Sequence, residues 1–217
     1  MTPTPPKQPP PTLLLATRNR GKLVELTALM AAQPWAAAAG LAVAGAADRT
    51  DLPDPEETGT TFAENAALKA LAYAEAAGTW CLADDSGLEV DALDGRPGVL
   101  SARYAADDAA RMARLLAELD AGGARTPAER AARFRCAMAL ASPDGRVVAE
   151  TSGTLEGYIA DSPAGLFGFG YDPLLMVPEL GRRLAETEPA IKNAMSHRGR
   201  ALAAMLPHLR VALGHAE

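Results

Sequence analysis

Two adjacent acidic residues, Asp84 and Asp85, come directly after a short apolar run, Trp80 to Ala83. The run is typical of a buried strand, and the Ser86-Gly87 pair that follows is typical of a turn. We therefore expect the strand to end in a glycine turn that carries both carboxylates. Two neighbouring negative charges in a partly buried place repel each other unless a cation or water offsets them. The pattern predicts Mg²⁺, which binds one or two carboxylates together with phosphate oxygens of a substrate. A solvated turn without a ligand is the alternative.

A polar loop near the start of the chain lies between a strand pattern and a helix pattern. The apolar run from Thr12 to Thr17 is of strand type, and leucines at helical spacing begin at Leu23. Free amide groups and the helix dipole at such a helix start attract anions, and the basic residues of the loop add to this attraction. We therefore expect a phosphate site, with a basic helix start that binds no ligand as the alternative. Its residues are Thr17, Arg18, Asn19, Arg20, Gly21 and Lys22.

A glycine-rich segment later in the chain carries two aromatic rings, in FGYDP at 169–173. Its glycines let the backbone approach a flat ligand closely, and Phe169 or Tyr171 could stack on that ligand. Asp172 or a main-chain group could read the edge of the same ligand. The segment predicts a base pocket, and the alternative is a loop that packs on the core.

Two helix starts bring further cationic groups into the argument. Ser196 is a favourable N-cap, so His197 and Arg198 fall in a first helical turn, where they can converge on an anion or a purine carbonyl. A single histidine at a helix start is also common on a plain surface.

The other start is the capping box Thr61 to Glu64, and Gly78 is expected to end that helix. Asn65 and Lys69 are four residues apart on it and share a face, so Lys69 can point toward the acidic pair. A solvated helix face is the alternative.

These segments, in this order, resemble the inosine triphosphate pyrophosphatase family, which hydrolyses noncanonical purine nucleoside triphosphates such as ITP, dITP and XTP. The resemblance runs from about Leu13 to about Leu206. The products in that family are the nucleoside monophosphate and pyrophosphate. The motifs that carry the resemblance are TRNRGK (17–22), EETGTTFAENAALKA (56–70), ADDSGLEVDALDGRPGVLSARYA (83–105), FGYDP (169–173) and KNAMSHRG (192–199).

The resemblance implies a role for each matching residue. Asp85 would be the general base and a metal ligand, and Glu56 is expected to be the second ligand of Mg²⁺, with Glu57 as the alternative. Lys69 would face the phosphates and Ser86 would touch the substrate. The phosphates would be held by residues 17–22. The nucleoside pocket and its phosphate side would be formed by Phe169, Gly170, Tyr171, Asp172, Lys192, His197 and Arg198.

Three features depart from the family pattern. Arg18 stands where a small residue is commoner, Ile191 precedes Lys192 where an acid is usual, and a proline-rich leader, residues 1–11, extends the N-terminus. We expect the leader to be disordered. None of these departures removes a residue assigned to the chemistry.

The order of the remaining patterns indicates the fold class. A helix is expected to begin at Asp107 and to end at Gly122-Gly123, followed by a hairpin that turns at 142–145 and returns over Arg146 to Ile159. Residues 12–214 are therefore predicted to form one α/β domain with a long mixed sheet flanked by helices. The resemblance adds two lobes with a central active-site cleft, and a homodimer.

Composition excludes several classes of protein. The formal net charge of −6 argues against a nucleic-acid surface, which is usually basic. No apolar run approaches the ~20 residues of a membrane span. Cys81 and Cys136 lack metal-site spacing and are expected to be buried thiols of a cytoplasmic protein.

Two other functions stay open at this point. One is a Maf-like pyrophosphatase that acts on modified pyrimidine nucleotides. The other is a nucleotide-binding protein without catalysis, although retention of Asp85 together with Glu56 and Glu57 argues against it.

Overall fold

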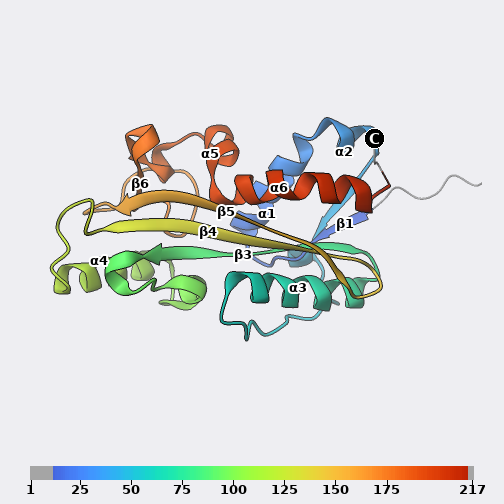
Figure 1. Ribbon diagram of the computed structural model, residues 1–217, viewed down its shortest axis with the longest axis horizontal. Coiled ribbons are helices and arrows are strands. Elements are labelled where there is room, and N and C mark those ends of the chain that lie inside the picture. The colour runs from blue at the N-terminus through green and yellow to red at the C-terminus, as the bar shows by residue number, and fades with distance from the viewer. Residues whose placement is uncertain (1–11, 215–217) are drawn as a thin grey trace, which may run out of the picture.

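A seven-stranded mixed sheet runs through the molecule in the order β2-β1-β3-β4-β5-β6-β7 (Figure 1). The computed structural model describes residues 12–214, so the predicted disordered leader lies outside the described residues. The strands are β1 (Thr12–Leu15), β2 (Ala42–Gly45), β3 (Trp80–Val90), β4 (Ala131–Ala141), β5 (Val147–Ile159), β6 (Leu175–Val177) and β7 (Arg182–Arg183).

The sheet is parallel at one edge and antiparallel elsewhere. β1 pairs in parallel with both β2 and β3, and every pair from β3 to β7 is antiparallel. The parallel edge needs helical crossovers, and the long β4-β5 hairpin needs only a tight turn. The predicted α/β fold with a long mixed sheet is therefore confirmed.

Helices cover both faces of this sheet (Figure 1). They are α1 (Arg20–Ala31), α2 (Pro34–Ala38), α3 (Phe62–Ala77), α4 (Asp108–Ala121), α5 (Pro189–Met195) and α6 (His197–Ala212). Short 3₁₀ segments are η1 (Ala46–Asp48), η2 (Asp91–Leu93), η3 (Gly98–Arg103), η4 (Pro178–Leu180) and η5 (Leu184–Glu186).

Local capping signals set the helix ends that matter for the site. The Thr61 and Glu64 side chains form the expected capping box of α3, and Gly78 ends the helix in the left-handed conformation at φ 61°. The Asp107 and Ser196 side chains accept hydrogen bonds from backbone amides at the starts of α4 and α6. These predicted boundaries are confirmed.

The predicted glycine turn after Ala83 is wrong. β3 continues for 11 residues from Trp80 to Val90, and it pairs with β4 from Cys81 to the end. The β4 ladder satisfies the backbone groups of this polar stretch, so the chain has no need to turn there. Side chains alternate along a strand, and Asp84 and Asp85 therefore point to opposite faces of the sheet.

The same alternation divides the core. Leu13, Leu15 and Leu82 pack with α1 and α6 on one face, whereas Leu14 and Cys81 pack with α3 on the other. A third cluster fills the far end of the sheet, where Leu88, Phe134 and Leu155 meet Leu115 and Leu119 of α4. The two acids thus lie on opposite faces, at the point where three hydrophobic clusters adjoin.

Both cysteines are buried free thiols, as expected, and burial raises the pKa of each to about 12. No helix within residues 12–214 is long and apolar enough to cross a membrane.

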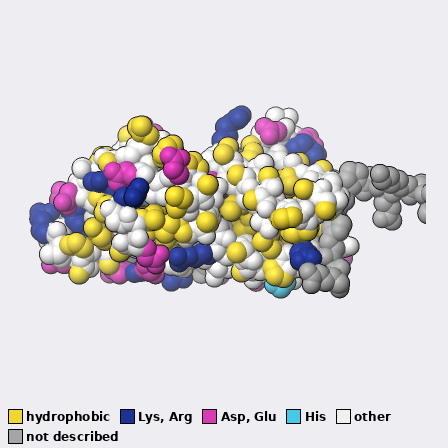
Figure 2. Space-filling model, turned by 90° about the horizontal axis from the view of Figure 1, so that it is seen from above, with side chains coloured by type: hydrophobic (Ala, Val, Ile, Leu, Met, Phe, Trp, Pro, Cys, Tyr) yellow, Lys and Arg dark blue, Asp and Glu magenta, His cyan; other side chains and the backbone are white. Residues whose placement is uncertain are grey.

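The face covered by α5, α6 and α2 carries side chains of mixed character (Figure 2). Acidic and basic groups are interspersed over one half of this face and are sparse over the other half, where hydrophobic side chains prevail. Among the described residues this face shows no continuous basic surface of the kind that nucleic-acid binding requires.

Gly153 of β5 allows α6 to lie directly on the sheet. A β-carbon at this position would overlap with the carbonyl oxygen of His197 and would lie 2.6 Å from the backbone nitrogen of Ala201. Both contacts are with helix backbone, which cannot move without moving α6. Since α6 begins with His197 and Arg198, this close approach also fixes their height above the sheet.

We expect Gly153→Ala to lower the free energy of unfolding by about 1–3 kcal/mol, because α6 must shift away from β5. Urea denaturation would measure the change. Val148→Ala, on the same strand and at a side chain that is 45% exposed, is the matched control and should change the free energy by no more than about 0.5 kcal/mol. Wild-type stability of Gly153→Ala would contradict the direct packing of α6 on β5.

Candidate functional site

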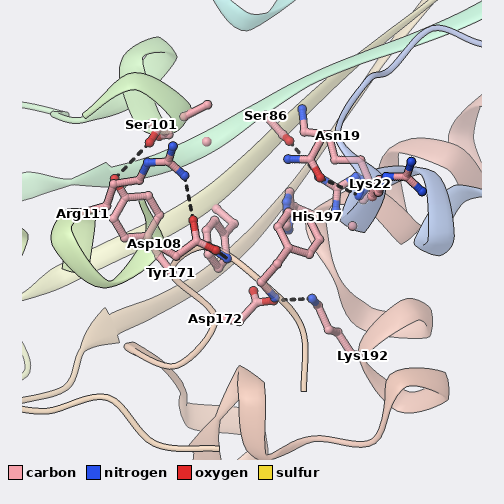
Figure 3. A pocket seen from close by; sticks show the side chains of 18 residues that line it. Asn19, Lys22, Ser86, Ser101, Asp108, Arg111, Tyr171, Asp172, Lys192 and His197 are labelled. Atoms are coloured by element: carbon pink, nitrogen blue, oxygen red, sulfur yellow. Dashed lines mark hydrogen bonds and ion pairs between the residues drawn. The ribbon is translucent and has the colours of Figure 1, made fainter. Parts of the chain in front are cut away.

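Two cavities open side by side around the start of α1 and the middle of β3. The first, the aromatic cavity, has a volume of about 380 Å³ and is lined by Phe134, Phe169, Tyr171 and His197 among others (Figure 3). The second, the carboxylate cavity, has a volume of about 500 Å³ and contains Asp85 with several acidic and basic side chains. The two cavities share Asn19, Lys22, Ser86 and Ala102.

The loop before α1 forms the boundary between the cavities. The Asn19 side chain accepts a hydrogen bond from Lys22 N at 3.1 Å, and Thr17 Oγ1 accepts one from Asn19 N at 3.2 Å. This folding of the loop presents the free amides of α1 and the Lys22 ammonium to the shared space.

The other members of the predicted phosphate site divide between the two cavities. Arg18 is bound to the 52–54 loop, through Leu52 O at 2.8 Å and Asp54 Oδ1 at 3.3 Å, and lines the carboxylate cavity. Arg20 and Gly21 line the aromatic cavity. The loop therefore faces both cavities at once.

Asp85 faces the carboxylate cavity, where Lys69 of α3 meets it. Lys69 Nζ lies 3.0 Å from Asp85 Oδ1 and 2.6 Å from Glu57 Oε1, and Asn65 donates a hydrogen bond to Asp85 Oδ2 at 3.3 Å. Burial raises the pKa of Asp85, against the opposing effect of Lys69 and Lys22. The expectation that Lys69 and Asn65 share a face toward the acids is confirmed.

The two candidate glutamates differ in position. Glu57 is half-buried, and its carboxylate bonds Lys69 and lies 3.5 Å from Arg103 Nη1. Although burial would raise the pKa of Glu57, the Lys69 charge lowers it overall. Glu56 is exposed at the rim of the same cavity. The geometry thus favours Glu57 as the second carboxylate beside Asp85, since both contact Lys69. Spacing along the chain had favoured Glu56.

Asp84, on the opposite face of β3, holds the cations of two helices. Its Oδ2 lies 3.2 Å from Lys22 Nζ of α1 and 3.3 Å from Arg198 Nε of α6, and it accepts a hydrogen bond from Ser86 Oγ at 3.2 Å. Burial alone would raise the pKa of Asp84, but Lys22 and Arg198 hold it well below its usual range. Asp84 is therefore an ionised anchor, a role that was not assigned from the sequence.

A buried charge network forms the floor of the aromatic cavity. Lys192 Nζ bonds Asp172 Oδ2 and lies 2.6 Å from Glu25 Oε1, and Glu25 also pairs with Arg198. Arg198 in turn donates to Ser86 Oγ at 2.8 Å. Glu25 was missed in the sequence, although its position one turn after Lys22 on α1 places both on one helix face.

The two rings of the FGYDP segment have different environments. Phe169 lies beside the cations, with Lys192 Nζ at 5.1 Å and Arg198 Cζ at 5.6 Å from its ring centroid. A β-carbon on Gly21 would come within 2.5 Å of this ring, so Gly21 lets the ring pack on the start of α1. Tyr171 is only 4% exposed and donates to Ser101 O at 3.1 Å. Phe169 is thus the ring that is available for stacking.

His197 stacks on Phe134 of β4, with ring centroids 4.8 Å apart. Burial lowers the pKa of His197 well below its usual value, and the Arg198 and Lys192 charges add to this effect. The imidazole is therefore neutral at neutral pH. Phe134 was not assigned to the site from the sequence, because strand alternation does not reveal which core ring borders a cavity.

Side chains from η3 and α4 complete the aromatic cavity. Ser101, Asp108 and Arg111 line it, and Asp108 accepts a hydrogen bond from Gly170 N at 2.8 Å. The sequence placed Asp108 and Arg111 in an ordinary helix, since no local signal indicates that the start of α4 reaches the FGYDP segment. All predicted site residues nevertheless lie at these two adjoining cavities.

The fold and the two cavities define an α/β protein whose site suits a ligand with a flat ring and a polyanionic tail. Comparisons with known proteins are more specific. The model of the Ham1 family matches residues 13–208. The chain belongs to this family, and the resemblance found in the sequence is confirmed.

The relatives cover nearly the whole chain. A dITP/XTP pyrophosphatase from Gloeobacter violaceus is 52% identical over 196 residues, which are 89% of this chain and 92% of the relative. One from Geobacter sulfurreducens is 50% identical and covers 91% of this chain and 96% of its own length. Among solved structures, a HAM1 protein from Coxiella burnetii has a TM-score of 0.79 at 39% identity, covering 93% of this chain and 100% of that chain.

We expect the stability of the protein to fall below about pH 6.5 because of His197. In the unfolded chain the imidazole of His197 takes up a proton as the pH falls through 6.5. In the folded protein the pKa of this imidazole lies well below that value. Protonation therefore favours the unfolded state, and the stabilisation is fully present above pH 6.5 and is lost as the pH decreases. This group should contribute a loss of about 1 kcal/mol between pH 7.5 and 5.5.

Urea denaturation of the wild type and of His197→Gln at both pH values would measure this contribution. The difference in stability between the two pH values should be about 1 kcal/mol smaller in the variant. Equal pH dependence in both proteins would show that the folded imidazole takes up its proton normally.

Proposed function

We propose that this protein hydrolyses noncanonical purine nucleoside triphosphates, such as ITP, dITP and XTP, to the nucleoside monophosphate and pyrophosphate. The observation that carries the proposal is the junction of the two cavities at Lys22 and Ser86. A nucleotide has the same two parts, a flat base and a polyanionic tail. Relatives that are about half identical over most of their length and are named dITP/XTP pyrophosphatase support the same function.

The chemistry requires a water molecule to attack the α-phosphorus while the pyrophosphate leaves. Asp85 would orient or deprotonate that water, since its raised pKa makes it a better proton acceptor than an exposed aspartate. Lys22 and Lys69 would compensate the charge of the phosphates, which is the main requirement of phosphoryl chemistry.

A divalent cation fits the same cavity. Glu57 and Asp85 would hold Mg²⁺, because their carboxylates lie together in this cavity, close enough for both to contact the Lys69 ammonium. Residues 12–214 contain no group of three or more His, Cys, Asp or Glu residues suited to a metal, but Mg²⁺ commonly takes only one or two carboxylates and completes its shell with water and phosphate oxygens. When bound, the cation would supply charge neutralisation for the phosphates.

Base selection would depend on hydrogen-bond donors at the 6-position. His197, Arg198 and main-chain amides can donate to the 6-oxygen of hypoxanthine or xanthine, whereas the 6-amino group of adenine would leave these donors unpaired. Phe169 would stack on the ring. The buried ion pair of Lys192 and Asp172 would hold the floor of this pocket in place.

The purine preference separates this function from a Maf-like pyrophosphatase of modified pyrimidine nucleotides, and the names of the relatives favour the purine reaction. A protein that only binds nucleotides needs no general base, so Asp85 together with the two glutamates of the carboxylate cavity argues against that alternative. A homodimer and a cytoplasmic location, both expected from the sequence, stay predictions.

The test is pyrophosphate release from ITP, XTP, ATP and a modified pyrimidine triphosphate, with and without Mg²⁺. We expect Mg²⁺-dependent release from ITP and XTP, and Asp85→Asn should fold normally but lose at least about 100-fold in kcat. Preference for the pyrimidine nucleotide would support the Maf-like alternative. Binding of ITP without release would support the non-catalytic one.

The two glutamates provide a matched pair for the cation site. Glu57→Gln should reduce Mg²⁺-dependent turnover at least about tenfold and raise the Mg²⁺ concentration needed for half-maximal activity, because a neutral amide is a poorer ligand. Glu56→Gln, at the exposed rim, should change both quantities by no more than about twofold. A Mg²⁺ titration of both variants measures the difference, and the reverse order would assign the role to Glu56.

A further inference from the structure

The end of the aromatic cavity that faces away from the phosphate loop is formed by α4. Figure 3 shows Arg111, Asp108 and Tyr171 on one side of the cavity, with Asn19 and Lys22 on the other side. Neither Arg111 nor Asp108 has a role in the reaction proposed above. Both nevertheless line the cavity, and the Arg111 guanidinium lies at the end where the base of a bound nucleotide would lie farthest from its phosphates.

Arg111 is held in a defined position. Its Nη1 lies 2.7 Å from Asp108 Oδ1, and its Nε donates to Ala105 O at 3.2 Å. Among residues 12–214 no hydrogen bond from its Nη2 is found, so this nitrogen can donate to a ligand. The Arg111 side chain is 21% exposed, and it borders the cavity.

Asp108 connects this arginine to the segment that carries the stacking ring. Its Oδ2 accepts a hydrogen bond from Gly170 N at 2.8 Å, while its Oδ1 binds Arg111. The guanidinium is therefore fixed relative to Phe169, the residue before Gly170. A base stacked on Phe169 would meet Arg111 in a reproducible geometry, which specific recognition requires.

The shape of a purine nucleotide determines which part of the base reaches Arg111. With the phosphates at Lys22, the six-membered ring is the part of the base farthest from them. The 6-oxygen is assigned to donors near His197, so the 2-position, across N1 from it, remains to be read. Xanthine has a carbonyl group there and hypoxanthine has only hydrogen. The second carbonyl also makes xanthine the stronger acid, so near neutral pH it carries more negative charge on this edge.

We propose that Arg111, positioned by Asp108, donates a hydrogen bond to the 2-oxygen of xanthine and thereby determines how strongly XTP is preferred over ITP. This inference rests on the proposed function. Hydrogen bonds from charged donors are worth more than neutral ones, so the loss of one such bond should be visible in substrate preference.

The experiment measures kcat/KM for XTP and for ITP in the wild type and in Arg111→Met. Met keeps much of the length and apolar volume of the side chain but removes every donor. We expect kcat/KM for XTP to fall about tenfold more than that for ITP. Arg111→Lys keeps the charge and should retain part of the preference. Arg146→Met, in the exposed β4-β5 turn and outside both cavities, is the matched control and should leave the ratio unchanged.

A second variant separates recognition from structural support. Asp108→Asn keeps an oxygen that can accept from Gly170 N but removes the charge that holds Arg111, so it should lower the XTP to ITP ratio in the same direction and by a smaller factor. Equal losses for both substrates in Arg111→Met, or an unchanged ratio, would overturn the proposal. If the wild type releases pyrophosphate from neither nucleotide, the proposed function itself fails, which is a different result.

Discussion

The placement of Asp84 and Asp85 on opposite faces of β3 is the constraint on which the rest of the site depends. Adjacent carboxylates inside a protein would repel each other strongly if they shared one environment. In the extended strand each has its own cations: Lys22 and Arg198 for Asp84, and Lys69 for Asp85. The Asp84-Asp85 pair thus binds cations of helices on both faces of the sheet, at the place where the two cavities adjoin.

The charges under the aromatic cavity form a network in which every member depends on the others. Glu25 bridges Lys192 and Arg198, and Lys192 also pairs with Asp172. Removing one partner of such a buried pair leaves an uncompensated charge, which is strongly destabilising, whereas the intact network adds little net stability. Its more important consequence is rigidity, because donors held in fixed positions can discriminate between bases that differ by a single group.

Much of the fold follows from local signals, such as helix caps and turn residues, that can be recognised in the sequence. The capping box at Thr61 and the N-caps Asp107 and Ser196 set helix starts, and the turn at 142–145 set the hairpin of β4 and β5. The acidic pair was the exception, since Asp, Ser and Gly favour turns when considered alone. Pairing with β4, a contact between residues about 50 apart in the chain, overrode that local preference.

The sequence by itself determined the family, because five motifs in a fixed order identified it, and it named many of the residues that line the two cavities. It did not reveal the role of Asp84 or the presence of Glu25 and Arg111 at the site. Tertiary structure decided how they act together. Only the packing of α1 and α6 on one face of the sheet and of α3 on the other shows that Asp84 pairs with Lys22 while Asp85 faces Lys69. The same packing shows that Glu57 meets Lys69 beside Asp85, and that the start of α4 brings Arg111 to the aromatic cavity. The physical reason is that caps and periodicity are set by residues within one or two turns, whereas charge compensation in a buried site depends on groups that meet only after the sheet has formed.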